Sequence, residues 1–390
     1  MFAAMLLAVS ILVAEDPTAG INDLVELLGQ VDDPAVQRDL MQGMIEALRG
    51  RRDVGLPPGW AAAAKPLVGS KDAEVRRLAR QLGARFGDPM ILAAEQKRAA
   101  DRTLALADRR EALELLIERH AKGLEPLLLA LLDDQDLRGL AVRGLALYSD
   151  PAVPAQILQR YPEWPAVLRE DALQTLASRA AFADALLSAI EAKQLPATDV
   201  TPYHARQMVN LKNKLITERL DKLLGASRAA HPDKKELMEK YKKLLTAERL
   251  AAGDASRGRA IFEKTCSRCH TLYGEGGKVG PDLTGSNRNN LDYVLENVLD
   301  PSARIGRGFQ MVVLELHDGR LLTGMVTAQD PHRVTLQTPS EAIVVPKSDI
   351  AEETLSPLSL MPEGIFDTMK LEEVCDVIAY LGTKQQVEKK

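Results

Sequence analysis

Residues 262–285 read FEKTCSRCHTLYGEGGKVGPDLTG, and this stretch contains the pattern that decides the fold of the C-terminal part of the chain. Two residues separate Cys266 from Cys269, and His270 follows the second cysteine directly. Two thiols one helical turn apart, with an imidazole next to them, can serve metal binding, thiol–disulfide chemistry or attachment of a prosthetic group. The remainder of the sequence discriminates among these three uses.

Structural zinc and a redox-active dithiol are both weakly supported. Zinc requires four ligands, and the chain has three cysteines and no second CxxC pair. Cys375 stands alone in LEEVCDVIAYLG, where apolar residues recur at helical spacing, so we expect a buried packing cysteine. A thioredoxin-like dithiol would follow a strand in a βαβ unit, whereas this pattern follows ASRGRAIFEKT, an amphipathic helix.

The order of the three residues matches the requirements of c-type haem. Two thiols can add to the two vinyl groups of the porphyrin, and the next residue can place its imidazole under the iron. The pattern therefore predicts one covalent haem c per chain, attached at Cys266 and Cys269, with His270 as the proximal iron ligand. No catalytic residue is predicted.

A six-coordinate haem needs a second axial ligand, and a thioether is the ligand that raises the reduction potential. Met311 and Met325 lie in strand-like runs, and Met369 leads into the last helix. Met361 lies in LSPLSLMPEGIF, which reads as an irregular loop bounded by prolines. A loop can bring its sulfur across the ring face, so Met361 is the predicted second ligand.

Residues 309–350 alternate apolar and polar side chains and are punctuated by pairs such as Asp318-Gly319 and Asp330-Pro331. This pattern predicts four or five short antiparallel strands. We therefore expect an all-α haem domain at residues 253–390, interrupted by a small antiparallel β insert.

The segment before this domain is rich in alanine and leucine and predicts a HEAT-like α-solenoid over residues 17–197. Its helices share a charged start and a small residue on the inner face, and the equivalent positions recur at a period of about thirty residues. These positions are Ala79, Ala112, Ala141 and Ala172. The fold class expected for the whole chain is mainly α, and an irregular helical bundle is the alternative to the solenoid.

Residues 198–252 are polar and lysine-rich but keep helical periodicity, which predicts a solvated, charged helical connector. The lysines could alternatively form a docking surface for an acidic partner. His204 and His231 are isolated, and we expect both at the surface or at helix ends.

Residues 1–16 form a signal-like segment. MFAAMLLAVSILVA carries no charge and is shorter than the ~20 residues that span a bilayer, so no stable membrane span is predicted. It fits the apolar part of a secretory signal without the usual preceding basic residues; a buried or frayed helix is the alternative. We expect an exported protein in the periplasm or an equivalent extracytoplasmic compartment. The net charge of -5 argues against a nucleic-acid partner.

The C-terminal third resembles the cytochrome c-like haem-binding domain at the C-termini of exported planctomycete and verrucomicrobial proteins, where it often follows HEAT-like repeats or a dehydrogenase-type β-propeller. The resemblance rests on GDASRGRAIFEKTCSRCHTLYGEGGKVGPDLTG, LDYVLENVLDPSARI, DGRLLTGMV, SLMPEG and VIAYL. It implies thioether bonds at Cys266 and Cys269, iron ligation by His270 and Met361, and a bond from the carbonyl of Pro281 to the proximal imidazole.

The same resemblance implies a helix crossing between residues 258–262 and Tyr380. Lys278 and Arg288 are candidates for contacts with the haem propionates. Because no dehydrogenase or propeller segment is present, we expect electrons to pass to or from a separate redox partner protein, with a dehydrogenase as the class suggested by the family.

Three functions fit these observations. The main hypothesis is a non-enzymatic electron carrier with a His/Met-ligated haem, whose helical repeats dock the redox partner. The second is a haem enzyme or small-ligand sensor with an open iron position. The third is a structural scaffold in which haem serves as a folding core. Binding of carbon monoxide to the ferrous protein would distinguish the first from the second.

Overall fold

The computed structural model describes residues 19–52, 54–224, 233–306 and 308–389. These residues form 18 α-helices, a five-stranded antiparallel sheet and a two-stranded ribbon, so the predicted mainly helical class with a small antiparallel sheet is confirmed. The signal-like segment 1–16 and His231 lie outside the described residues. In the part that is described, no helix has the length and apolar character needed to cross a membrane.

The chain divides into two compact units, one ending at Leu127 and one beginning at Leu128. This division falls inside the segment predicted as a single repeat array, so a continuous solenoid stays a prediction. All four alanines used to define the repeat are fully buried. Each faces the interior of its own unit, as the predicted inner face requires.

The first unit is helical. Its helices are α1 (Ala19–Gln30), α2 (Pro34–Ala47), α3 (Trp60–Val68), α4 (Ala73–Phe86), α5 (Pro89–Ala100) and α6 (Leu106–Glu118). Asp33 and Asp88 each precede a proline, and their side chains accept hydrogen bonds from the first turns of α2 and α5. The Asp-Pro pairs therefore begin helices, as capping chemistry predicts.

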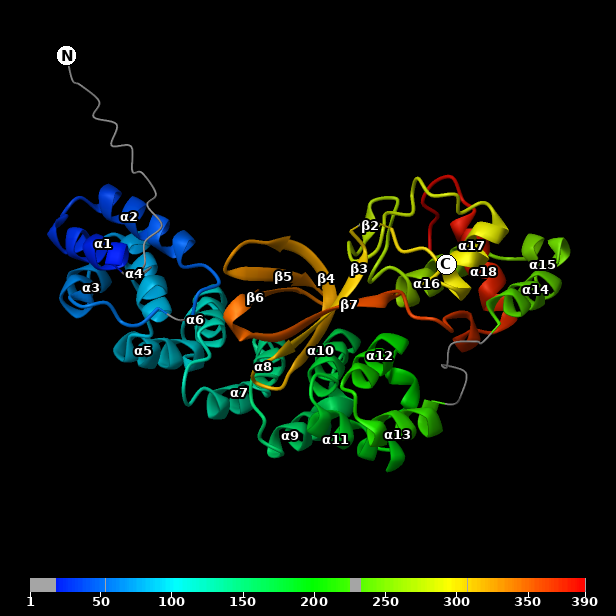
Figure 1. The fold of residues 1–390 in the computed structure, drawn as a ribbon, viewed down its shortest axis with the longest axis horizontal. Helices are drawn as coiled ribbons and strands as arrows, with labels where there is room; N and C mark the ends of the chain where they lie inside the picture. Colours follow the sequence, from blue (N-terminus) through cyan, green and yellow to red (C-terminus); the bar gives the residue numbers. More distant parts are fainter. Residues whose placement is uncertain (1–18, 53, 225–232, 307, 390) are drawn as a thin grey trace, which may run out of the picture. The chain divides into compact units, whose positions relative to one another are not determined.

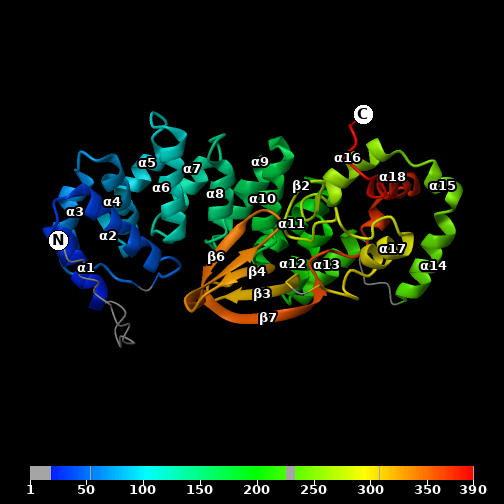
Figure 2. The same ribbon diagram turned by 90° about the horizontal axis from the view of Figure 1, so that it is seen from above.

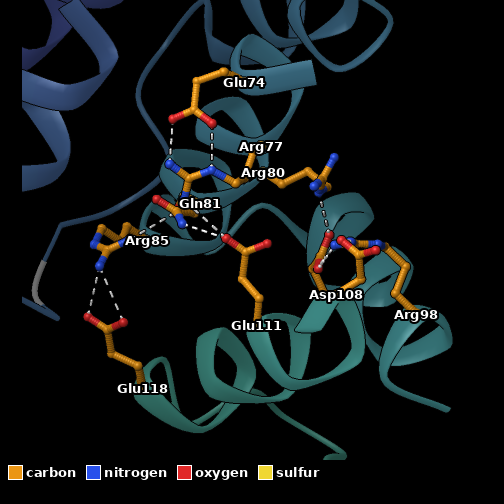
Figure 3. Close-up of polar contacts among 10 residues, drawn as sticks. Glu74, Arg77, Arg80, Gln81, Arg85, Arg98, Asp108, Glu111 and Glu118 are labelled. Atoms are coloured by element: carbon orange, nitrogen blue, oxygen red, sulfur yellow. Dashed lines mark hydrogen bonds and ion pairs between the residues drawn. The ribbon is translucent and has the colours of Figure 1, made fainter. Parts of the chain in front are cut away.

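Ion pairs link α4, α5 and α6 on one face of this unit (Figure 3). Arg77 of α4 contacts Glu111 of α6 at 3.2 Å, and Arg80 of α4 lies 3.4 Å from Glu95 of α5. Burial raises the pKa of Glu95, although Arg98 and Arg80 oppose that shift. Each of the arginines labelled in Figure 3 lies near a carboxylate that balances its charge. We therefore interpret this face as one that supports the packing of the helices, and not as a binding site for anions.

Helix α7 (Glu125–Leu131) spans the division between the units. The second unit then contains α8 (Arg138–Leu145), α9 (Ala152–Arg160), α10 (Ala166–Leu176), α11 (Ala180–Glu191), α12 (Pro202–Asn210), α13 (Lys214–Leu224), α14 (Lys234–Leu244), α15 (Ala247–Ala251), α16 (Ala255–Thr265), α17 (Leu291–Leu299) and α18 (Leu371–Leu381). The short strands β1 (Thr271–Leu272) and β2 (Glu275–Gly276) form a ribbon after α16.

The β insert is an antiparallel sheet of β3 (Gln310–Leu316), β4 (Leu321–Gln329), β5 (Arg333–Gln337), β6 (Ala342–Pro346) and β7 (Ile350–Ser359), in the order β6-β5-β4-β3-β7. The prediction ended the insert at 350 and read the following residues as a loop. That boundary is wrong, because β7 pairs with β3 as an edge strand. A register shift between Gln310 and Val312 accommodates Pro357, which has no N–H to donate.

The predicted solvated connector is also wrong in part. Helix α12 packs against β4, as both ribbon views show (Figures 1 and 2), and its Tyr203, His204, Gln207 and Met208 are buried. In α14, Leu237 and Tyr241 join the C-terminal helical core. Both helices are amphipathic, and each has a neighbour that covers its apolar face; in α14 the lysines lie on the solvated face.

The last helices form the core that supports the CxxCH segment. Helices α16 and α18 cross at Gly258, where a Cβ atom would lie 1.9 Å from the carbonyl oxygen of Asp376. One turn later, the rings of Phe262 and Tyr380 meet edge to face at 5.4 Å. This is the crossing that the resemblance implied.

Candidate functional site

The CxxCH segment continues directly from α16. The backbone N–H groups of Cys269 and His270 donate to the carbonyl of Cys266 at 3.1 and 3.0 Å. These bonds form one turn that brings both thiols and the imidazole to the end of the helix. Both cysteines are free thiols.

The glycine-rich segment that follows the CxxCH turn folds back and hydrogen-bonds to it. Gly277 donates to Ser267 and Gly280 donates to Cys269, both at 2.6 Å. A Cβ at Gly277 would lie 1.9 Å from the carbonyl oxygen of Arg268. Only glycine allows so close an approach between the two backbone segments.

Pro281 lies against the imidazole, and its carbonyl oxygen is 2.9 Å from His270 Nδ1. A carbonyl can only accept a hydrogen bond, so the proton resides on Nδ1 and the lone pair of Nε2 is left for a ligand. Burial lowers the pKa of His270, and the bond to Pro281 opposes this shift. The site therefore favours the neutral imidazole that metal ligation requires.

Burial raises the pKa of the Cys266 thiol to about 12, with Cys269 adding to the shift. Burial likewise raises the pKa of Cys269 to about 11, which Arg268 opposes. Both thiols are protonated at neutral pH and face apolar surroundings.

The two cysteines face different apolar clusters. Cys266 and Met361 both pack against the core formed by the C-terminal helices. Cys269 packs against a second cluster, whose buried members are Tyr203, Val279, Met311, Met325 and Leu360. Met361 follows the end of β7 by two residues, and its N–H donates to Ser359 Oγ at 3.1 Å.

Several features of this site escape sequence reasoning. Met311 and Met325 are direct cross-strand partners on β3 and β4, and the strand pattern alone gave no sign that they lie beside Cys269. Arg288 is not a solvent-facing cation, because it is buried and donates to the carbonyls of Leu283, Leu381 and Thr383. Cys375 is buried, as predicted.

Among the residues that the structure describes, no group of three or more His, Cys, Asp or Glu side chains converges to hold a metal ion.

In a comparison with known protein families, residues 253–309 match the family described as cytochrome c oxidase, cbb3-type, subunit III. The C-terminal part of this chain contains a cytochrome c-type domain. Cytochrome c from Cochliobolus lunatus and from Arabidopsis thaliana are each 53% identical over 34 residues, which is 8% of this chain and 32% or 30% of theirs.

A cytochrome c-553-like protein from Synechocystis is 42% identical over 48 residues, or 12% of this chain and 45% of the relative. The chain thus spans between 30% and 45% of the length of these curated relatives. The cytochrome c family implies covalently bound haem c.

The residues of this cytochrome c-type domain fit that cofactor. Two free thiols lie one turn apart at the end of a helix, and a neutral imidazole follows with Nε2 unprotonated. The apolar clusters beside Cys266 and Cys269 supply the surroundings that a porphyrin ring requires. Cys266, Cys269 and His270 would hold the haem.

A side chain from outside the matched segment contacts the CxxCH turn. Arg268 pairs with Glu170 of α10, whose second oxygen lies 3.2 Å from His204 Nε2. Burial raises the pKa of Glu170, but His204 and Arg268 outweigh this effect and hold it at about 2. His204 is fully buried, so the expectation of a surface position was wrong, although it does lie at a helix start.

The depressed pKa of Glu170 predicts an acid-sensitive contribution to stability. Its ordinary value is 4.5, so the contribution is present above pH 4.5 and is lost as pH falls toward 2. We expect Glu170→Gln to lower the free energy of unfolding at pH 7 by about 3 kcal/mol and to flatten its decline below pH 4.5. Denaturant unfolding at a series of pH values measures this; parallel profiles for the two proteins would contradict it.

Gly280→Ala should disturb the proximal ligand. The added Cβ would lie 2.5 to 3.0 Å from ring atoms of His270, so the imidazole must move and lose its bond to Pro281. We expect a mixed-spin ferric spectrum in place of a low-spin one. Gly285→Ala is the matched control, since a Cβ there meets nothing within 4 Å. Identical spectra for the two variants would show that Gly280 does not constrain the ring.

Proposed function

We propose that this protein is an exported electron-transfer protein with one covalently attached haem c ligated by His270 and Met361. The observation that carries the proposal is the His270 imidazole, whose Nδ1 is tied to Pro281 so that Nε2 is free, on a turn that also presents two thiols. A fixed, neutral imidazole is the arrangement expected of a permanent iron ligand.

When bound, the haem iron supplies a reversible ferric–ferrous couple. Cys266 and Cys269 would hold the ring at the end of α16, and Pro281 fixes the orientation of His270. Met361 would supply a thioether ligand, which favours the ferrous state. The apolar clusters exclude water, which keeps reorganisation small when the charge changes.

The partner and compartment belong to the same proposal. Cytochrome c-type maturation takes place outside the cytoplasm, and the uncharged run of residues 1–14 agrees with export. The helical residues 17–197, proposed here as HEAT-like repeats, would dock a separate redox protein, with a dehydrogenase as the class of partner. Electrons then enter and leave through that partner.

The test is a redox titration of the haem-loaded protein combined with exposure of the ferrous form to carbon monoxide. An electron carrier should titrate reversibly with a single one-electron wave and bind carbon monoxide weakly, because Met361 occupies the iron. Rapid, stoichiometric binding of carbon monoxide would instead favour the enzyme or sensor. Irreversible or absent reduction would favour the scaffold.

A further inference from the structure

Helix α12 reaches the segment that carries the predicted distal ligand. Arg206 Nη1 donates to the carbonyl oxygen of Ser359 and lies 3.5 Å from the carbonyl oxygen of Met361. The guanidinium therefore contacts the main chain on both sides of Leu360, at the end of β7. A charged donor shared between two carbonyls fixes the path of the backbone from which the Met361 side chain projects.

Helix α10 reaches the proximal side. Glu170 has only 13% of its side chain exposed, and its carboxylate pairs with Arg268, which lies between the two cysteines. The N–H of Thr201 donates to His204 Nδ1 at 3.2 Å, so the proton of this imidazole lies on Nε2, which is 3.2 Å from Glu170 Oε1. One carboxylate is thus held by the arginine on one side and by a buried histidine on the other.

The two contacts belong to one surface. Between them, the hydroxyl of Tyr203 donates to the carbonyl of Thr323 at 3.1 Å and accepts from Gln174 Nε2 at 3.2 Å. Its ring packs in the same cluster as Cys269. Helices α10 and α12 therefore adjoin both ligand-bearing segments, and Tyr203 fills the space beside one thiol.

We propose that α10 and α12 are positioning elements of the haem site, with Arg206 fixing the Met361 segment and Glu170 fixing the CxxCH turn. This inference rests on the proposed His/Met ligation. It extends the site beyond residues 253–309, where the family match lies, into helices that precede the cytochrome c-type domain. Other charged contacts between the helices and the C-terminal residues, such as Arg179 with Asp318, lie away from the ligand-bearing segments, whereas the contacts of Arg206 and Glu170 fall on them.

The experiment compares holoprotein variants with a charged pair of the same kind elsewhere in the helical region. Arg206→Gln and Glu170→Gln are the test variants. Arg219→Gln and Glu191→Gln are the matched controls, because Arg219 pairs with Glu191 at 2.8 Å and neither residue contacts the haem domain in the described contacts. Arg206→Lys keeps the charge and one donor, and it serves if the glutamine variant does not fold.

Arg206→Gln should raise the apparent affinity of the ferric haem for added imidazole about tenfold, because the segment that carries Met361 is no longer held. Arg206→Lys should give a smaller increase. Glu170→Gln should shift the paramagnetic NMR resonances of the ferric haem, which report the orientation of the axial ligands. The two controls should match the unmodified protein in both measurements.

The proposal is overturned if Arg206→Gln and Arg206→Lys bind imidazole within twofold of Arg219→Gln, and if Glu170→Gln gives the resonances of Glu191→Gln. Failure of the underlying His/Met ligation looks different. In that case the unmodified protein itself lacks the far-red absorption band of a thioether-ligated ferric haem, which overturns the role of Arg206 together with that of Met361.

Discussion

Replacing Met361 with alanine should convert the ferric haem from low-spin to high-spin and lower its reduction potential by on the order of 0.1 to 0.2 V. The thioether sulfur is a weak donor that stabilises ferrous iron, and its removal leaves the sixth position to water or to added ligands. The visible spectrum, a redox titration and carbon monoxide binding to the ferrous protein measure the three consequences.

Met369→Ala is the matched control for this change. Met369 is also partly buried and packs against the same helical core, but it leads directly into α18. We expect the control to lose stability without a change in spin state or potential. If both alanine variants keep a low-spin spectrum, Met361 is not the ligand; Met311 and Met325, which lie beside Cys269, then become the thioethers to test.

Gly258→Ala should unfold the C-terminal helical core at a lower temperature than any surface change. Alanine in the interior of α16 would ordinarily gain about 1 kcal/mol of helix propensity over glycine. Here the Cβ would lie 1.9 Å from the carbonyl oxygen of Asp376 and 2.9 Å from the Cβ of Tyr380, so α16 and α18 must separate. We expect a loss of about 3 kcal/mol, which lowers Tm by about 10 °C.

The measurement is thermal unfolding followed both by circular dichroism and by the haem absorption. Gly285→Ala should leave both transitions unchanged, since a methyl group there projects into open space. If Gly258→Ala is as stable as Gly285→Ala, the crossing of α16 and α18 is not the tight contact described here.

The parts of the site that lie close together in sequence could be predicted. The two thiols, the imidazole, the glycines and Pro281 fall within one short stretch, so local turn geometry alone brings them together. The strand pattern of the insert was equally local, and the segments that it indicated form β3 through β6. In each case the information was carried by residue spacing.

The parts that depend on distant partners could not be predicted. Strand β7 is almost wholly exposed and contains Pro357, so its sequence does not alternate between apolar and polar residues. It forms a strand because its backbone pairs with the edge of β3. Helix α12 has a polar sequence, yet its Tyr203 and His204 are buried because β4 and α10 cover them. Arg206 contacts main-chain carbonyls, and every residue has one, so the sequence does not indicate which residues these contacts involve.

The most direct test of the central claim is a pair of visible spectra, oxidised and reduced, of protein matured with a periplasmic c-type system, recorded before and after denaturation. The account predicts a low-spin, six-coordinate haem in both oxidation states that stays attached to the chain when the protein unfolds. Haem that is extracted on denaturation, or a native ferric spectrum that is already high-spin, would contradict it.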